Sequence, residues 1–406
     1  MKKRVLVWLT LDFSEFCIAN NIQKNEELEL YAVIDTPYYP SKFYQEQKLV
    51  KFTKIWYLHD FIKKQHRPDV SYLSNFEKKY NINLWKLAIN ERIFYRFYNF
   101  HKYTDEEILS IDEQVCRFFE TILEEVKPHI LITKDPGFHH LEILSQMCQK
   151  KNVKVLIPFV PKLANRLTIT DDPSRINPKI SYEFTETSGR SFQELRIILE
   201  KGNTANTIKN FLKKFGTSKI ELFKAAVHYL LLSNNRSEEL LYTYYGRTKL
   251  NVLKYEIVTR LKTKYRKWFI DRNLERNPPL DQPFVYFAMG VDLERNILMN
   301  APFFTNQVEV IRHIAKSLPV EYRLYVKEAP AQKTRSWRKI SEYNDIIHLP
   351  NVRLIHPDYP TKNLFERCSL VATIAGSSGM EAAFYEKPSI IFADTMYSVL
   401  SSVFRV

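Results

Sequence analysis

Hydrophobic positions along the chain fall into short unbroken runs separated by stretches with helical spacing. The first apolar run covers residues 4–10 and the second covers residues 29–35, with a predicted helix over residues 14–23 between them. Unbroken apolar runs of this length are typical of strands that a parallel sheet buries on both faces. The chain therefore opens with the strand–helix–strand order of an α/β fold.

The same order continues to residue 158. After residues 104–107 the apolar positions recur at helical spacing and predict a long amphipathic helix, which Pro128 ends. The strand of residues 129–133, the helix of residues 141–150 and the strand of residues 153–158 follow. This alternation predicts a parallel sheet with helices on both of its faces.

From about residue 174 to residue 275 the pattern is mostly helical, and its later part is strongly basic. The basic positions are Arg247, Lys249, Lys254, Arg260, Lys262, Lys264, Arg266, Lys267 and Arg272. Such a stretch fits either a solvated helix between two domains or a surface for an anionic membrane or another polyanion. The Pro-rich segment at residues 277–283 reads as a linker. We expect three parts: an N-terminal α/β domain over 1–173, a helical connection over 174–276 and a C-terminal α/β domain over 277–406.

Five strands are expected in the C-terminal part, and their edges carry the candidate chemistry. They cover residues 284–288, 322–327, 352–355, 370–375 and 389–392, with helices at 305–318 and 364–367. Only 8 of the 406 residues are glycine, and two of them, Gly376 and Gly379, lie three residues apart in the turn after the fourth of these strands. Scarce glycine is placed where the backbone requires it.

A strand–turn–helix of this kind is suited to a phosphate group. Free N–H groups and the helix dipole favour anions at a helix start, at the carboxyl end of a parallel strand. Ser377 and Ser378 add hydroxyl donors, and Glu381 is placed to accept from ribose hydroxyls. Ser378 and Glu381 also have capping-box spacing, so a well-capped helix without a ligand is the plain alternative.

Two further strand ends supply candidate partners for the same phosphate groups. Lys327 and Glu328 close one strand, and His356 follows another. In a parallel sheet these ends share an edge with the glycine turn, where a lysine and a histidine can neutralise a diphosphate or a departing nucleotide. Taken singly, a loop histidine is more often only a polar turn residue.

These residues together resemble the capsule polysaccharide biosynthesis proteins, a family of proposed glycosyltransferases of the two-domain GT-B type. The matching order runs through Phe284–Phe287, Glu294, Phe304, Gln307, Ile311, Leu324–Glu328, Asn351–Ile355, Gly376–Ala382 and Lys387-Pro388. The N-terminal half resembles the same proteins more loosely, through Leu84-Trp85, Arg92 and Lys127–Ile130. The resemblance implies two Rossmann-like domains that face each other across a cleft, with a helical segment between them.

The chain departs from the family pattern in two places. Ala329 stands where relatives commonly have the histidine of Lys-Glu-His-Pro. The resemblance also implies further elements after Phe392, including a helix that returns to the first domain, whereas the sequence stops at Val406. A truncated C-terminal domain is therefore expected.

The resemblance places the acceptor in the first domain, where a general base must lie within reach of the attacking hydroxyl. Asp12 ends the first strand, and Asp135, His139 and His140 follow the strand at residue 132. We select Asp12 and His139. No Asp-x-Asp pair stands out, so no metal and no cofactor is expected beyond the nucleotide-sugar substrate.

Composition limits the range of partners. Lys and Arg number 60 against 46 Asp and Glu, a formal net charge of +14, which fits nucleic acid, an anionic membrane, phosphorylated ligands or simply a lysine-rich surface. The basic helix lacks the aromatic platform of single-strand binders, so nucleic acid ranks lowest. The four cysteines form no C-x-x-C pair, and the apolar run after Met1 stops at Asp12 without a cleavage site. We expect a cytoplasmic protein, with peripheral contact at the inner face of the cell membrane as an option.

The sequence thus predicts a glycosyltransferase that moves a sugar from a nucleotide sugar to a surface polysaccharide or its lipid-linked precursor. A nucleotide-linked polyol-phosphate transferase and a nucleotide-sugar epimerase stay open as alternatives. A catalytically inactive polysaccharide-assembly protein also stays open, because it fits Ala329 and the short C-terminus.

Overall fold

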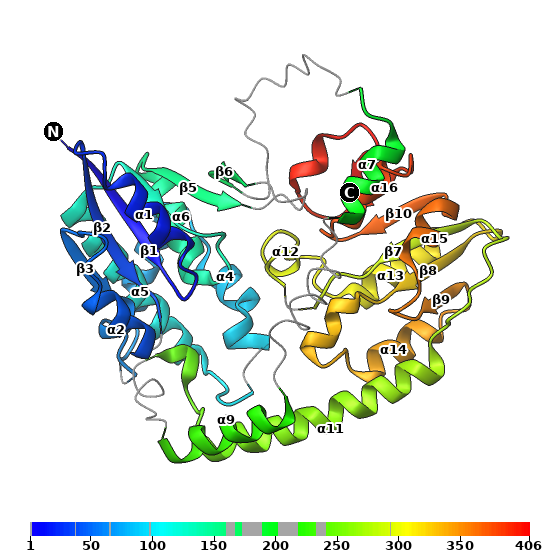
Figure 1. The fold of residues 1–406 in the computed structure, drawn as a ribbon, viewed down its shortest axis with the longest axis horizontal. Helices are drawn as coiled ribbons and strands as arrows, with labels where there is room; N and C mark the ends of the chain where they lie inside the picture. The colour runs from blue at the N-terminus through cyan, green and yellow to red at the C-terminus, as the bar shows by residue number, and fades with distance from the viewer. Residues whose placement is uncertain are drawn as a thin grey trace. The chain divides into compact units, whose positions relative to one another are not determined.

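A computed structural model describes residues 2–36, 38–64, 66–96, 99–159, 167–172, 189–201, 218–232, 241–292 and 294–406 (Figure 1). The chain divides into two compact units. Unit 1 comprises Met1–Phe159, Thr168–Asp171 and Lys219–Leu253, and unit 2 comprises Lys254–Val406 with the described parts of Val160–Leu167 and Asp172–Ser218. Each unit contains one six-stranded sheet.

The sheet of unit 1 has the order β3-β2-β1-β4-β5-β6, in which only β6 runs antiparallel to its neighbour. Its strands are β1 (Lys3–Leu9), β2 (Leu28–Ile34), β3 (Lys54–Tyr57), β4 (Ile130–Ile132), β5 (Lys154–Phe159) and β6 (Thr168–Thr170). This is the Rossmann order 3-2-1-4-5-6. Val5, Val7 and Leu9 of β1 pack into one core, while Trp8 points to the other face and contacts Phe119 edge-on.

Helices flank this sheet on both sides. The helices of unit 1 are α1 (Ser14–Ile22), α2 (Tyr38–Glu46), α3 (Val70–Tyr80), α4 (Leu84–Asn90), α5 (Asp105–Val126), α6 (His139–Lys150) and α9 (Lys219–Leu232). A capping box between Thr104 and Glu107 begins α5. Lys127 ends α5 in the left-handed conformation, one residue before Pro128.

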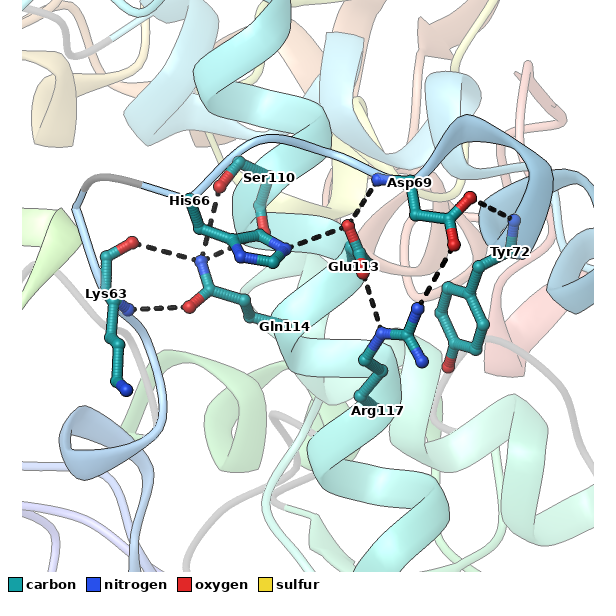
Figure 2. Close-up of polar contacts among 8 residues, drawn as sticks. All are labelled: Lys63, His66, Asp69, Tyr72, Ser110, Glu113, Gln114 and Arg117. Carbon is teal, nitrogen blue, oxygen red and sulfur yellow. Dashed lines mark hydrogen bonds and ion pairs between the residues drawn. The ribbon is translucent and has the colours of Figure 1, made fainter.

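A polar clamp on α5 fixes the loop that leads into α3 (Figure 2). The Gln114 side chain accepts from the backbone N–H of Lys63 and donates to its carbonyl. Buried Glu113 accepts from the backbone N–H of Asp69 at 2.6 Å and pairs with His66 and Arg117. Two side chains at consecutive positions of one helix thereby satisfy backbone polar groups of a loop that lies outside the sheet.

The sheet of unit 2 is parallel throughout and has the order β12-β11-β10-β7-β8-β9, again the Rossmann order. Its strands are β7 (Phe284–Ala288), β8 (Arg323–Lys327), β9 (Val352–Ile355), β10 (Leu370–Thr373), β11 (Ser389–Ile391) and β12 (Val403–Arg405). Its helices are α7 (Phe192–Lys201), α11 (Lys249–Asn273, whose first turn groups with unit 1), α12 (Arg295–Leu298), α13 (Gln307–Ser317), α14 (Ile340–Ile347), α15 (Thr361–Arg367) and α16 (Ser378–Ala383).

Both faces of the second sheet are buried, as the unbroken apolar sequence of β7 requires. Val285 and Phe287 pack with Ile311 and Tyr343 in one core, and the alternate residues of β7 pack in the other. The α/β fold with two Rossmann-like domains is therefore confirmed. The cleft between them stays a prediction.

The sequence prediction located the long strands to within one or two residues and missed β3, β6 and β12. Parts of the predicted helical connection, residues 174–188, 202–217 and 233–240, lie outside the described residues. Of the remainder, residues 219–232 and 241–253 group with unit 1, and residues 189–201, 218 and 254–276 group with unit 2. In the described part of the chain no helix is long and apolar enough to cross a membrane.

Candidate functional site

In each unit the strand order reverses between the first and fourth strands, which creates a crevice at the carboxyl edge of the sheet. In unit 2 this switch point lies between β7 and β10, and the Gly376–Gly379 turn follows β10 directly. Lys327 ends β8, two strands from β10, and His356 follows β9, three strands away. At the usual strand spacing these positions are ~10 Å and ~14 Å from β10.

The helix start at the glycine turn differs in detail from the capping box expected between Ser378 and Glu381. The N-cap residue is Ser377, and no side chain caps the helix. Instead Ser377 Oγ donates to Glu381 Oε1 at 2.8 Å. The capping-box prediction is therefore wrong, because Ser377 already has helical backbone angles (φ −59°, ψ −16°) and pairs with the residue one turn ahead.

Close packing, not a left-handed backbone, requires the two glycines. A Cβ atom on Gly376 would lie 2.6 Å from Thr373 Oγ1, and one on Gly379 would lie 2.9 Å from the Tyr397 ring. The Tyr397 hydroxyl donates to the carbonyl of Gly376. Tyr397 thus covers the turn, a contact that no local sequence signal could have revealed across a separation of 21 residues.

Lys327 holds a buried ammonium group at the same edge. The residue is 4% exposed, and its Nζ donates to Thr361 Oγ1 at 3.1 Å, its one hydrogen bond within the described structure. Burial lowers the pKa of Lys327 to about 8, against the opposing fields of Asp358, Glu328 and Glu381. The cation is thus desolvated and weakly compensated, and an anionic ligand would stabilise it.

Glu328 and His356 have structural partners that change the roles expected of them. The Glu328 carboxylate is fully buried and accepts from Arg338 Nε at 2.8 Å and from the Tyr343 hydroxyl at 3.0 Å. His356 is 2% exposed, pairs with Asp271 through Nε2 at 3.1 Å and accepts from the backbone N–H of Asp358 through Nδ1. Neither side chain is free to meet a donor nucleotide, so we correct both assignments: Glu328 anchors β8 to Arg338, and His356 anchors the end of α11.

In unit 1 the switch point lies between β1 and β4, and Asp12 lies just beyond β1. Asp12 is exposed, and its Oδ1 accepts from the Ser14 hydroxyl at 2.6 Å, which lowers the pKa of Asp12. Lys134, which follows β4, bridges back to Thr10 Oγ1 at 3.1 Å. Sequence reasoning passed over Lys134, although its place after a strand end could have identified it.

His139 lies away from solvent, between two carboxylates. The side chain is fully buried, with Nδ1 3.1 Å from Glu91 and Nε2 3.1 Å from Asp112. Burial disfavours the imidazolium, but Asp112 and Glu91 outweigh it and raise the pKa of His139 to about 9. A protonated, inaccessible histidine cannot accept a proton from a substrate, so the choice of His139 as a general base is corrected.

His140 belongs to a second buried chain of polar groups. Its Nδ1 lies 2.8 Å from the Tyr242 hydroxyl, and its Nε2 lies 3.1 Å from Asp35 Oδ2. Together the two histidines tie the N-terminus of α6 to β2, α4, α5 and the Tyr242 segment. Among the described residues no three His, Cys, Asp or Glu side chains group as metal ligands would, and the need for a metal or cofactor stays untested.

Comparison with known proteins gives one family match. Residues 207–401 match the family model described as capsule polysaccharide biosynthesis protein. The resemblance read from the sequence is confirmed for this region. No curated protein matches the chain.

Several solved structures are distantly similar to this chain. The beta Kdo 2,7 transferase KpsC of Thermosulfurimonas dismutans is 13% identical, with 80% of this chain and 81% of that chain covered and a TM-score of 0.34. The UDP-GlcNAc 2-epimerase of Methanocaldococcus jannaschii is 11% identical, with 100% and 89% covered and a TM-score of 0.26. The N-terminal domain of Candida albicans trehalose-6-phosphate phosphatase is 11% identical, with 100% and 86% covered and a TM-score of 0.31. Likenesses with TM-scores this low carry no argument about fold or chemistry.

Proposed function

We propose that the protein is a glycosyltransferase that moves a sugar from a nucleotide-sugar donor to a capsular or other surface polysaccharide, or to its lipid-linked precursor. The family description, capsule polysaccharide biosynthesis protein, supports a role in the synthesis of a capsular polysaccharide. The Rossmann order of unit 2 supports a nucleotide at its carboxyl edge. The donor phosphates would lie over the turn of Gly376, Ser377, Ser378 and Gly379, with the ribose near Glu381.

The buried ammonium of Lys327 is the observation that carries this proposal. A lysine that only completes a fold normally keeps its charge in water or pairs it with a carboxylate, because an uncompensated buried charge is costly. Here the ammonium donates to one hydroxyl group in the described structure, and Asp358, Glu328 and Glu381 offset its burial only in part, at a sheet edge where Rossmann folds bind nucleotides. A diphosphate is the ligand that this position would accept.

On the acceptor side we propose Asp12 as the proton acceptor, at the switch point of unit 1. The carboxylate is exposed, and its lowered pKa keeps it ionised, as an acceptor of protons must be. The neighbouring Lys134 would orient an acceptor hydroxyl or a phosphate group of a lipid-linked acceptor. Asp12→Asn should then abolish transfer while leaving donor binding unchanged.

The donor site is tested first by thermal unfolding with the UDP, GDP, CMP and CDP series. A ligand at ~100 times its dissociation constant adds about 2.7 kcal/mol to the free energy of unfolding. We expect one nucleotide series to stabilise the native protein, and we expect Ser377→Ala, Glu381→Gln and Lys327→Met to remove that effect. Lys316→Met, at an exposed lysine on α13, is the matched control. If no series stabilises the native protein, the donor site is refuted.

Turnover assays separate the alternatives. A nucleotide-sugar epimerase converts its substrate with no acceptor present, whereas a glycosyltransferase releases the nucleotide only when an acceptor is added. A polyol-phosphate transferase releases a nucleoside monophosphate. Stabilisation by a nucleotide without turnover would identify an inactive assembly protein, and activity in the presence of a chelator would test the expectation that no metal is needed.

A further inference from the structure

Helix α11 carries a row of large apolar side chains on its outer face. Ile257, Leu261, Tyr265 and Trp268 are 60%, 62%, 60% and 52% exposed. Their spacings of four, four and three residues place them on one side of the helix. The rings of Tyr265 and Trp268 are stacked, with centroids 5.8 Å apart.

The opposite side of α11 already packs on the core of unit 2. Ile270 is 1% exposed within that core, and Phe269 stacks on Tyr343. Arg266 points inward and donates to the carbonyls of Ser336 and Trp337. The inner side of α11 therefore holds the helix against unit 2. The exposed outer row does not contribute to that packing.

Basic side chains surround this row. The exposed basic residues of this stretch are Lys254, Arg260, Lys262, Lys264, Lys267 and Arg272. Of the two exposed carboxylates in the same stretch, Glu256 lies 3.9 Å from Arg260, and Asp271 pairs with Arg276 and His356. The outer face therefore combines exposed apolar and aromatic groups with an excess of positive charge.

We propose that the outer face of α11 binds the surface of an anionic phospholipid bilayer, with the helix lying in the plane of the interface. The apolar row would enter the boundary between headgroups and acyl chains, Trp268 and Tyr265 would occupy the headgroup level, and the lysines would contact lipid phosphates. A second copy of the chain fits less well, because a symmetric contact would oppose like charges. Nucleic acid fits less well, because aliphatic Ile257 and Leu261 gain nothing from stacked bases.

This inference does not depend on the transferase activity. Co-sedimentation of the full chain with vesicles tests it, using phosphatidylcholine alone and phosphatidylglycerol-rich mixtures. Two variants divide the contributions: Leu261→Ser with Trp268→Ala removes apolar groups, and Lys254→Gln with Lys262→Gln and Lys264→Gln removes charge. Val320→Ser, at a valine that is 94% exposed outside α11, is the matched control.

The native protein and the control should bind the anionic vesicles and not phosphatidylcholine. The charge variant should bind about a hundredfold more weakly, since each Lys or Arg near an anionic surface contributes roughly fivefold. The apolar variant should also lose binding, and its residual binding should be more sensitive to salt. Equal binding to both kinds of vesicle, or unchanged binding by the apolar variant, would overturn the proposal. So would a smaller particle size of the apolar variant in solution, which would indicate that the face binds a second copy of the chain. Displacement of the protein from vesicles by generic DNA would overturn it in favour of nucleic acid.

Discussion

At the scale of single residues, Lys327 is a case in which stability and binding oppose each other. Lowering a lysine pKa from 10.5 to about 8 corresponds to a cost on the order of 3 kcal/mol in the unliganded protein. Lys327→Met should therefore raise the unfolding free energy at pH 7 by up to that amount, measured by denaturant unfolding. The same variant should lose stabilisation by nucleotides.

The pH dependence provides the check on Lys327. Because its folded pKa lies below the unfolded value, the unfolded state binds more protons between about pH 8 and 10.5, and stability from this group rises across that range. Nucleotide affinity should fall above about pH 8 as the ammonium loses its proton. A Lys327→Met protein that is less stable than the native protein at pH 7 would contradict this account.

The contribution of His139 to stability has the opposite pH dependence. Its folded pKa of about 9 lies above the unfolded value of 6.5, so its contribution is complete below pH 6.5 and is lost as the pH rises through 9. His139→Gln leaves Glu91 and Asp112 buried together without the cation. We expect a loss of about 3–5 kcal/mol at pH 6, with a smaller loss at pH 9.5, measured by urea unfolding.

The exposed His313 provides the control for His139. Its side chain is 69% exposed beside Glu309, so His313→Gln should change stability by less than ~0.5 kcal/mol at both pH values. A His139→Gln protein with the same loss at pH 6 and pH 9.5 would show that packing, and not charge, explains the burial of His139.

At the scale of elements, the glycine turn and the segment after β11 form one packed unit. Gly379→Ala would place a Cβ atom 2.9 Å from the Tyr397 ring, so the ring or the helix must move, at a cost of about 1–3 kcal/mol. Removing the ring by Tyr397→Ala should abolish most of that added cost. A double-mutant cycle measures the coupling, and additive losses would disprove the contact.

The same elements show where sequence reasoning succeeds and where it stops. Strands such as β7 could be predicted because burial on both faces leaves an unbroken apolar run. β6 and β12 are three residues long, at the edges of their sheets, and carry no such signal. Of the candidate site, Lys327 and the glycine turn follow from strand-end placement. The anchoring partners of Glu328 and His356 could not be predicted, because Arg338 and Asp271 meet them only through the tertiary fold.

At the scale of the whole molecule, the two units share one strand order, so topology alone does not assign the donor to either. The charges at the two switch points differ. Unit 1 places Asp12, Glu15 and Asp35 around Lys134, whereas unit 2 places buried Lys327 at the sheet edge that carries the glycine turn. An acidic edge opposes a diphosphate, and a buried cation favours it.

Hydrogen exchange with and without the stabilising nucleotide tests this assignment directly. Each unit has its own hydrophobic core, so a ligand held by one unit should protect that unit's edge and leave the other nearly unchanged. We expect slower exchange around residues 327–329, 358–361 and 376–381, and little change around residues 10–15 and 133–140. The reverse pattern would move the donor to unit 1 and leave the desolvated ammonium of Lys327 without its proposed ligand. Protection limited to unit 2 would assign the donor to that unit and leave the exposed Asp12 of unit 1 available for the acceptor.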